Sequence, residues 1–528
     1  MSSLLGKLIG PGAAPHARDK APEREERVVS ERSGAAPQPL GKPGSEGEGL
    51  LLFDEPFYLE RNGDVREKVG AGGGTALEHF LKYGRAEGRA PNPYTLKDHR
   101  GEVERVFVFG RYVFLTGWLD VPLADTDIAA VSFGGHKFDV RHSAFQYRRL
   151  DVCEAVGAPP FMQLGYAILT KIETEHLVSD EFSFRADGYG RKLYPQYFNR
   201  GGDFLDEVLK YFSNFQRMDG DGRGLYRIPR AMLKHLQALF SAYLAENEEP
   251  AVRLTSEPIP HDRKCAFVFV QCGPLPLLPA VFHYLRSTRF PVEVIIVNNS
   301  RAYREHALST LAELSTLLGV PWRYLEFARN IGFSSACNAA AAETDAEFVC
   351  FHNNDVFTAD PADYDRVIQA LVDNPRQVLG VRQRFPSGGL MHDGLQVGVL
   401  DPVMTNGAEG ILSGVSVGRG APPGRVFGPT FTSGSFLAVG RDLFRSVGGF
   451  SDQYLFGHFE DLDLCLRLAE EGAPTAILKD VSFIHSEGGG SAVPEHITRT
   501  VPMLNRLIFT ETWSARLAPL IEGEKADA

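Results

Sequence analysis

Cysteine is scarce in this chain, which has six cysteines in 528 residues. No two of them form a CxxC pair or a spacing typical of zinc ligands, and they are too scattered for a disulfide framework. We therefore expect reduced thiols, as in a protein of the cytoplasm. The six are Cys153, Cys265, Cys272, Cys337, Cys350 and Cys465.

Long apolar runs are also lacking. No stretch reaches the ~20 apolar residues that a helix needs to cross a bilayer. The apolar stretch at the N-terminus is only a few residues long and is followed by Pro11, so it does not resemble a signal peptide. We expect no integral membrane segment and a cytoplasmic location. Peripheral association with the inner face of the plasma membrane stays open.

The chain has no excess of positive charge. It carries 55 Lys and Arg against 67 Asp and Glu, for a formal net charge of -12. Proteins that bind nucleic acids present a basic surface, so we expect no nucleic-acid partner. No GxxxxGK[ST] motif occurs, which argues against a P-loop kinase or sulfotransferase. The length predicts several domains.

Composition and periodicity divide the chain into segments. The first is rich in Gly, Pro, Ala, Arg and Glu and poor in aromatics, which is typical of disorder. Short helical patterns follow, then an alternation of apolar and polar residues around glycine turns, which indicates antiparallel strands. The predicted segments are a disordered tail (1–48), a small helical module (49–98), a β-sandwich accessory domain (99–198), a helical linker (199–258), an α/β domain (259–500), and a C-terminal helix and tail (501–528).

From Cys265 onward, apolar strands alternate with helices, which predicts a mostly parallel α/β sheet. In such sheets, ligands bind at the carboxyl ends of the strands. Polar clusters stand at three of these ends, namely Asn298-Asn299-Ser300, Arg329-Asn330 and Asn353-Asn354-Asp355. This placement predicts a binding site without identifying its ligand.

Four motifs in a fixed order carry a family resemblance. They are Arg329-Asn330-Ile331-Gly332-Phe333-Ser334 with Asn338, then Asn353-Asn354-Asp355, then the stretch 432–472, then Phe483-Ile484-His485. Over residues 262 to 495, the chain resembles family 2 inverting glycosyltransferases of the Rossmann-like GT-A fold. The likeness is strongest to bacterial enzymes that build surface polysaccharides, including rhamnosyltransferases. The segments before this region are similar to modules found beside bacterial glycosyltransferase domains.

The resemblance implies an enzyme that moves a sugar from a nucleoside diphosphate sugar to a hydroxyl of a glycan or of a lipid-linked acceptor. Asp355 stands at the last position of the family's metal-binding Asp-x-Asp, whose first position is Asn353 here. His485 resembles the second ligand of Mg²⁺ or Mn²⁺, which would neutralise the diphosphate. A single carboxylate suggests metal binding that the substrate assists. Taken alone, Asp355 reads as a turn residue or helix cap, and His485 as a structural partner.

Glu460 and Asp461 open a predicted helix, where acidic residues also serve as simple caps. The resemblance implies that Asp461 is the general base toward the acceptor hydroxyl, while Glu460 positions the acceptor or nearby backbone. A positioned base contributes roughly 10²- to 10⁴-fold. Further along this helix, Arg467 is expected to pair with an acid.

Ser433 and Gly434 match the family's small-residue loop beside the donor sugar, where glycine permits close approach of the backbone. His392 matches a His-x-Gly feature ahead of that loop, although a polar turn explains it equally well. The family's acid that reads the nucleotide base is replaced by Asn298 or Asn299, which leaves the base open. The predicted substrate-binding residues are Asn298, Asn299, Asn330, Asn338, Asn353, Asn354, His392, Ser433, Gly434 and Arg467.

A catalytically inactive carbohydrate-binding or scaffold protein with a degenerate transferase domain is the alternative. The appended modules and the altered base-reading position favour it. The joint presence of Asp355, Asp461 and His485 argues against it, because a decayed site has no reason to keep three separated residues.

Overall fold

The computed structural model describes residues 53–526, with gaps at 90–100, 121–129, 140–143, 172–181, 219–223, 418–423 and 487–492 and at shorter stretches of one to three residues. The predicted disordered tail therefore lies outside the described residues. All six cysteines are described, and none of them is in a disulfide. Among the described helices, none is long and apolar enough to cross a membrane.

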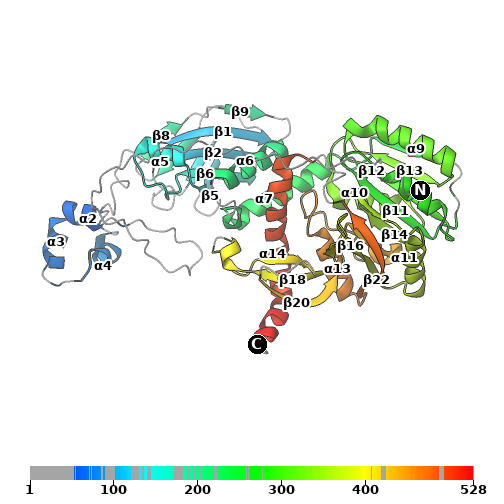
Figure 1. Ribbon diagram of the computed structural model, residues 1–528. Helices are drawn as coiled ribbons and strands as arrows, with labels where there is room; N and C mark the ends of the chain where they lie inside the picture. The colour runs from blue at the N-terminus through cyan, green and yellow to red at the C-terminus, as the bar shows by residue number, and fades with distance from the viewer. Residues whose placement is uncertain are drawn as a thin grey trace, which may run out of the picture.

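The first helices form a small cluster of their own at one end of the molecule (Figure 1). Their shared core is Phe53, Tyr58, Val65, Ala76 and Phe80. A capping box formed by the side chains of Thr75 and Glu78 begins the third helix. The elements are α2 (Glu55–Arg61), α3 (Gly63–Gly70), α4 (Ala76–His79) and the short π-helix η1 (Phe80–Gly84).

Two sheets follow, one of five strands in the order β5-β6-β2-β1-β9 and one of four in the order β4-β3-β7-β8. Pairing is antiparallel except between β1 and β9. Trp118 is half-buried against a small apolar cluster around Val152 and Met162. The domain boundaries and the sandwich arrangement stay predictions. The elements are β1 (Gly101–Phe109), β2 (Tyr112–Leu119), β3 (Ala130–Phe133), β4 (His136–Asp139), β5 (Ala144–Tyr147), α5 (Leu150–Val156), β6 (Gly165–Lys171), β7 (Phe182–Ala186), β8 (Tyr189–Leu193) and β9 (Tyr197–Arg200).

The helices α6 (Phe204–Met218) and α7 (Arg230–Ala245), with the 3₁₀ turn η4 (Gly224–Arg227) between them, connect the two halves of the molecule. Buried residues of both helices belong to one continuous core that runs from the five-stranded sheet to the large sheet. The helix α14 (Glu495–Ala526) contributes to the same core. Figure 1 shows α14 passing between the two halves.

The large sheet has ten strands, in the order β10-β13-β12-β11-β14-β21-β16-β22-β15 with β17 beside β16. This confirms the predicted α/β class. The strands β13, β12, β11 and β14 are parallel, as are β16 and β22, and the other pairs are antiparallel. The strands are β10 (Val252–Thr255), β11 (Cys265–Gln271), β12 (Val292–Asn298), β13 (Trp322–Glu326), β14 (Phe348–His352), β15 (Val356–Thr358), β16 (Val378–Arg384), β17 (Leu390–His392), β21 (Phe436–Gly440) and β22 (Thr475–His485).

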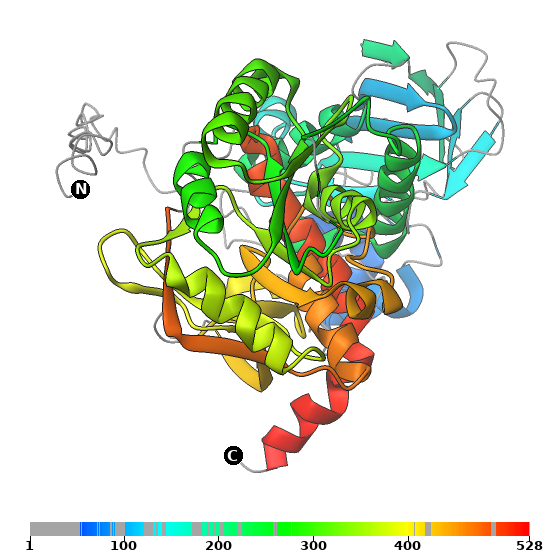
Figure 2. The same cartoon turned by 90° about the vertical axis from the view of Figure 1, so that its right-hand side faces the viewer.

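Helices cover both faces of this sheet, and strands such as β11 are therefore buried along almost their whole length. One face packs on α8, α9 and α11, and the other on α10, α13 and α14. In Figure 2, α14 passes behind the large sheet. The helices are α8 (Leu278–Arg286), α9 (Arg304–Leu318) after the turn η5 (Arg301–Tyr303), α10 (Gly332–Glu343), α11 (Ala362–Asp373), α12 (Arg441–Ser446) and α13 (Glu460–Glu470).

A small antiparallel sheet in the order β19-β18-β20 lies beside α14. The backbone N–H of Leu412 donates to Oγ1 of Thr510 on that helix (3.0 Å). The elements are β18 (Leu395–Leu400), η6 (Pro402–Thr405), β19 (Leu412–Ser416) and β20 (Gly424–Phe431).

Candidate active site

Asp355 and His485, predicted as metal ligands, lie side by side. Asp355 ends the turn after β14, and the next residue, Val356, is paired with His485 at the end of β22. Nε2 of His485 is 3.2 Å from Oδ1 of Asp355, and both side chains are about nine-tenths buried. Oδ1 receives no hydrogen bond from any residue that the structure describes.

Gln383 on β16 determines which nitrogen of His485 carries the proton. Its Nε2 donates to Oγ of Ser435 (2.7 Å), which leaves Oε1 as the acceptor 2.9 Å from Nδ1 of His485. In the tautomer that this contact selects, Nδ1 carries the proton and Nε2 turns a lone pair toward the Asp355 carboxylate. Two lone pairs that face each other favour a cation between them.

The spacing fits a divalent ion. Oxygen ligands at about 2.1 Å in octahedral geometry lie about 3 Å apart, close to the observed 3.2 Å. A histidine ligand also commonly donates its other ring N–H to a neighbouring acceptor, as His485 does to Gln383. The described residues contain no cluster of three His, Cys, Asp or Glu side chains suited to a metal. An ion here would therefore take its remaining ligands from the donor phosphates and water.

The structure places His392 near the Asp355–His485 pair, opposite Gln383 in the pairing of β17 with β16. Its side chain is buried, and Nε2 has no hydrogen-bond partner within the described ranges. Burial lowers the pKa of His392 to about 4, Asp393 opposes that shift, and His485 adds to it. A neutral imidazole therefore faces the site. The polar-turn interpretation alone does not account for an unpaired, buried ring nitrogen.

Asp461 lies against the small-residue loop. Its Oδ2 accepts from the backbone N–H of Gly434 (2.8 Å), and its Oδ1 accepts from that of Leu462 (2.7 Å). A Cβ at position 434 would lie 3.4 Å from Cβ of Asp461 and 3.3 Å from Cε1 of Phe333. Glycine thus allows the loop to approach the predicted base closely.

The same loop connects the predicted base to the predicted metal ligands. The carbonyl of Ser435 accepts from the backbone N–H of Asn353 (2.9 Å), and its hydroxyl contacts Gln383. Oγ of Ser433 accepts from the backbone N–H of Ser435 (3.3 Å). Asn354 lies in the turn that ends at Asp355. Backbone and side-chain contacts therefore link residues that are more than 100 positions apart in the sequence.

Glu460 and Asp461 differ in their surroundings. Glu460 is buried, and its Oε2 has no partner among the described residues. Burial first, and then the Asp461 carboxylate, raise the pKa of Glu460 well above its usual range. Burial also raises the pKa of Asp461, but the N–H groups of Gly434 and Leu462 oppose that shift. Of the two, Asp461 is therefore the carboxyl group whose charged form its hydrogen bonds stabilise, which suits it to accept a proton.

The loop before this pair is strained. Phe456, His458 and Phe459 have φ values of 52°, 77° and 72°, a region that residues other than glycine rarely adopt. Such strain is concentrated at functional sites and persists only where surrounding contacts hold it. Sequence reasoning missed this feature, because the residues involved carry no glycine or asparagine signal.

The ends of β12 and β13 form a second polar group. Asn298 donates to the hydroxyl of Tyr324 (2.8 Å), and Asn299 donates to the carbonyl of Gly332 (3.0 Å). Oδ1 of Asn299 is buried without a partner in the part of the chain that the structure describes. The side-chain amides of Asn298 and Asn299 therefore already donate hydrogen bonds within the protein.

Glu326 ends β13 directly opposite Asn298, and sequence reasoning missed it. It is 1 % exposed, and its Oε1 has no hydrogen-bond partner among the described residues. Nε of Arg304 lies 3.6 Å from Oε2, and Nε of Arg301 lies 4.0 Å from Oε1. A buried carboxylate thus stands beside the position where the family's acid is replaced by asparagine. The sequence feature that could have identified Glu326 as a site residue is its place at the end of an apolar strand.

Asn330, Asn338 and Arg467 are engaged by the protein itself. Oδ1 of Asn330 accepts from the backbone N–H of Gly332 (2.8 Å). The amide of Asn338 makes two hydrogen bonds with the backbone of Phe450 (2.8 and 2.9 Å). Arg467 pairs with Asp463, as expected (2.8 Å). These contacts favour structural roles for the three residues.

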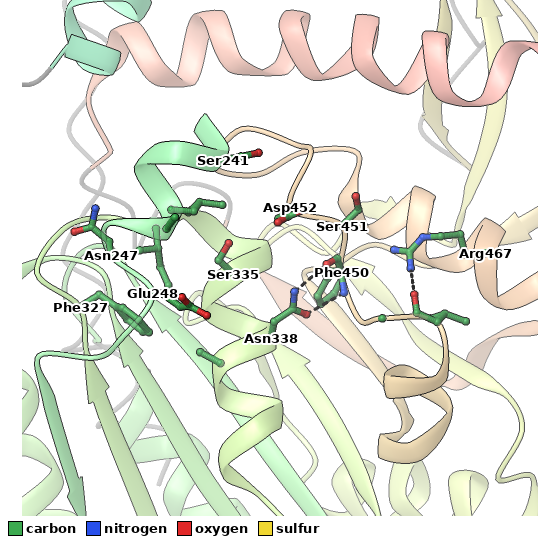
Figure 3. Close-up of a pocket in the computed structure, with 16 residues that line it drawn as sticks. Ser241, Asn247, Glu248, Phe327, Ser335, Asn338, Phe450, Ser451, Asp452 and Arg467 are labelled. Atoms are coloured by element: carbon green, nitrogen blue, oxygen red, sulfur yellow. Dashed lines mark hydrogen bonds between the residues drawn. The ribbon is translucent and has the colours of Figure 1, made fainter. Parts of the chain in front are cut away.

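Asn338 and Arg467 also line a cavity of about 790 Å³ between the end of α7, α10 and the segment 447–452. Figure 3 shows Ser241, Asn247 and Glu248 on one side of it and Arg467 on the other, with Asn338 bonded to Phe450 between them. The cluster around Asp355 and the residues Gly434 and Asp461 are not among the lining residues.

Comparison with known proteins gives one family. Residues 273–398 match the family described as glycosyl transferase family 2. The chain is 27% identical over 222 residues to O-antigen biosynthesis protein RfbC of Myxococcus xanthus, which covers 40% of the chain and 16% of RfbC. It is 29% identical over 151 residues to the uncharacterized protein y4gI of Sinorhizobium fredii (strain NBRC 101917 / NGR234), which covers 28% of the chain and 16% of that protein. The chain thus spans 16% of the length of each of these relatives.

Among solved structures, the chain is similar to GalNAc-T7 with UDP, GalNAc and Mn²⁺, with a TM-score of 0.37 and 13% identity over 48% of the chain and 49% of that protein. It is also similar to the mannosyltransferase PcManGT from Pyrobaculum calidifontis in complex with GDP-Man and Mn²⁺. There the TM-score is 0.32, with 13% identity over 61% of the chain and 86% of that protein.

Proposed function

The chain carries a family 2 glycosyltransferase domain, and from this premise we propose that it moves a sugar, with inversion, from a nucleoside diphosphate sugar to a hydroxyl of a glycan or lipid-linked acceptor. One observation carries the proposal. The predicted base, Asp461, and the predicted ligand pair, Asp355 and His485, belong to one connected network around the loop 433–435.

Asp355 and His485 would hold Mg²⁺ or Mn²⁺, whose charge offsets that of the leaving diphosphate. The buried, unpaired Oδ1 of Asp355 and the lone pair on Nε2 of His485 support this role. Gln383 keeps the imidazole in the required tautomer through its contact with Nδ1.

Asp461 takes the proton of the acceptor hydroxyl as the hydroxyl oxygen forms its bond to the anomeric carbon. The bond between that carbon and the diphosphate oxygen breaks on the opposite side, which inverts the configuration. The raised pKa of Asp461 supports this role, because a base whose pKa is closer to the working pH accepts a proton more readily. Glu460, held neutral by burial, stays out of the proton transfer and shapes the start of α13.

For the donor, we propose that Glu326 and Asn299 face the nucleotide base. Each has a buried acceptor oxygen without a hydrogen-bond partner in the described residues, and base-edge N–H groups supply matching donors. The likeness to O-antigen biosynthesis protein RfbC supports a place in bacterial surface-polysaccharide synthesis. A lipid-linked acceptor would bring the enzyme to the membrane surface.

A donor screen tests the proposal, following release of nucleoside diphosphate from UDP-, dTDP- and GDP-sugars with Mg²⁺ or Mn²⁺. We expect release from at least one donor and a fall of roughly a hundredfold or more in Asp461→Asn, with nucleotide binding nearly intact. Turnover within a few-fold of the wild type in Asp461→Asn would place the base elsewhere. Absence of release from every donor, with glycan binding intact, would favour the inactive binding protein.

A further inference from the structure

The segment from Leu455 to Phe459 leads directly into Glu460 and Asp461 and contains the three residues with positive φ. A backbone in this region is unfavourable for residues with a Cβ, so it needs compensating contacts. The segment itself supplies no side-chain cap, since Phe459, the N-cap of α13, makes no side-chain hydrogen bond to the first turn of the helix. The compensating contacts therefore come from elsewhere in the chain.

They come from Asn505, in the middle of α14. Its side chain is completely buried, and the hydrogen bonds that its amide makes within the described residues all go to this one segment. Oδ1 accepts from the backbone N–H of Leu455 (2.9 Å). Nδ2 donates to the carbonyls of Leu455 (2.9 Å), His458 (3.2 Å) and Gly457. A single amide thus contacts the backbone on both sides of the strained Phe456 and reaches the strained His458.

The held segment also contacts the start of α10. The carbonyl of Phe456 accepts from the backbone N–H of Phe333 (2.6 Å). Gly332, with φ of 81°, approaches Phe456 so closely that a Cβ there would lie 2.6 Å from its Cα. Phe333 in turn lies against Gly434, whose N–H donates to Asp461. The shape of the segment is therefore coupled to the surroundings of the predicted base.

The body of α13 has separate anchors. Asp463, one turn into the helix, accepts from Nε1 of Trp513 (2.9 Å) and from the hydroxyl of Tyr454 (3.2 Å), and it pairs with Arg467. Loss of the Asn505 amide would therefore leave the helix in place and release only the segment that precedes it.

We propose that Asn505 is a positioning residue for the transfer reaction, which holds the segment 455–459 in the strained shape that directs Asp461 at Gly434 and the acceptor. This role rests on the proposed function of Asp461 as the base. It assigns part of the catalytic arrangement to the C-terminal helix, outside residues 273–398 that match the family.

The test uses the full chain with two variants, Asn505→Ala and the nearly isosteric Asn505→Asp, which keeps an acceptor but loses both donors. Thr510→Val is the matched control, because it removes a hydrogen bond from the same helix to Leu412 and does not touch the segment. We expect both Asn505 variants to bind the nucleoside diphosphate within about threefold of the wild type and to lose about tenfold or more in kcat. The control should keep its kcat within about twofold.

A double-mutant cycle with Asp461→Asn separates positioning from general damage. If Asn505 acts through the base, the double variant should be no slower than Asp461→Asn alone. Fully additive losses would overturn the inference, and so would an unchanged kcat in both Asn505 variants. Loss of folded protein in both variants would assign Asn505 to stability and overturn the positioning role. If Asp461→Asn itself retains turnover, the proposed function fails first, which distinguishes the two failures.

Discussion

Replacing Gln383 by leucine removes the hydrogen bond that holds the imidazole of His485, together with the contact to Ser435 that orients the Gln383 amide. The change deletes the hydrogen bonds to Nδ1 of His485 (2.9 Å) and to Oγ of Ser435 (2.7 Å) at nearly constant side-chain volume. A buried N–H left without an acceptor costs about 1–3 kcal/mol. The freed imidazole can also adopt the other tautomer, in which Nε2 carries the proton and no longer offers a lone pair beside Asp355.

We expect the second effect to dominate the activity. Loss of the outer partner of a histidine ligand typically weakens metal binding by about 10- to 100-fold, which corresponds to roughly 1.4–2.8 kcal/mol. The apparent affinity for Mn²⁺ in a nucleoside diphosphate release assay should fall by this factor in Gln383→Leu, and saturating Mn²⁺ should restore most of the rate. The affinity for the acceptor should change little.

Gln396→Leu provides the matched control, since its amide makes a long contact to the carbonyl of Gly428 (3.4 Å) at the surface and no hydrogen bond to the residues around Asp355 that the structure describes. The Mn²⁺ dependence of this variant should match the wild type. An unchanged Mn²⁺ dependence in Gln383→Leu, with folded protein, would refute the assignment of His485 as a ligand held by Gln383.

Three further predictions follow from the buried carboxyl groups. The acid limb of the kcat–pH profile should lie above the usual range of an aspartate, because burial raises the pKa of Asp461. An acid limb near the ordinary aspartate value would contradict the role of Asp461 as the base. Glu460→Gln should stabilise the protein above about pH 5, because a carboxyl whose pKa is raised by folding lowers stability as pH rises beyond its unfolded pKa. Equal unfolding free energies of variant and wild type at pH 4 and pH 8 would contradict this. Glu326→Gln should weaken nucleoside diphosphate binding by roughly tenfold in titration calorimetry, with little change in kcat at saturating donor. Unaltered nucleotide binding in this variant would show that Glu326 does not contact the donor.

The sequence predicted the local elements of the catalytic half well, because their signals are local. The alternation of apolar strands and helices after Cys265 yields the observed α/β sheet. The polar clusters Asn298-Asn299, Arg329-Asn330 and Asn353-Asn354-Asp355 each follow a strand, as expected. The antiparallel pairing of β14 with β21, and of β15 with β22, was not predictable, since strand order depends on long-range packing.

The candidate site was only partly predictable for the same reason. Asp355, Asp461 and His485 stood in motifs, whereas Gln383, Glu326 and Asn505 stand in no recognised pattern. Their surroundings arise only when distant strands and helices meet. Asn338 and Arg467 show the opposite case, since both belong to motif stretches. Asn338 nevertheless hydrogen-bonds to the backbone of Phe450, and Arg467 hydrogen-bonds to Asp463.

Residue order alone therefore predicted the family 2 glycosyltransferase class, and the family resemblance supplied Asp461 and Asp355 as the predicted base and metal ligand, because such motifs are short patterns of residue type and spacing. The tertiary structure decided which ring nitrogen of His485 faces Asp355, the difference between Glu460 and Asp461, and the contacts that hold the strained segment before them. Those properties depend on burial and on contacts between residues far apart in the chain, such as Asn505 with Leu455 and Gln383 with His485. Only folding creates such contacts, so no local pattern encodes them.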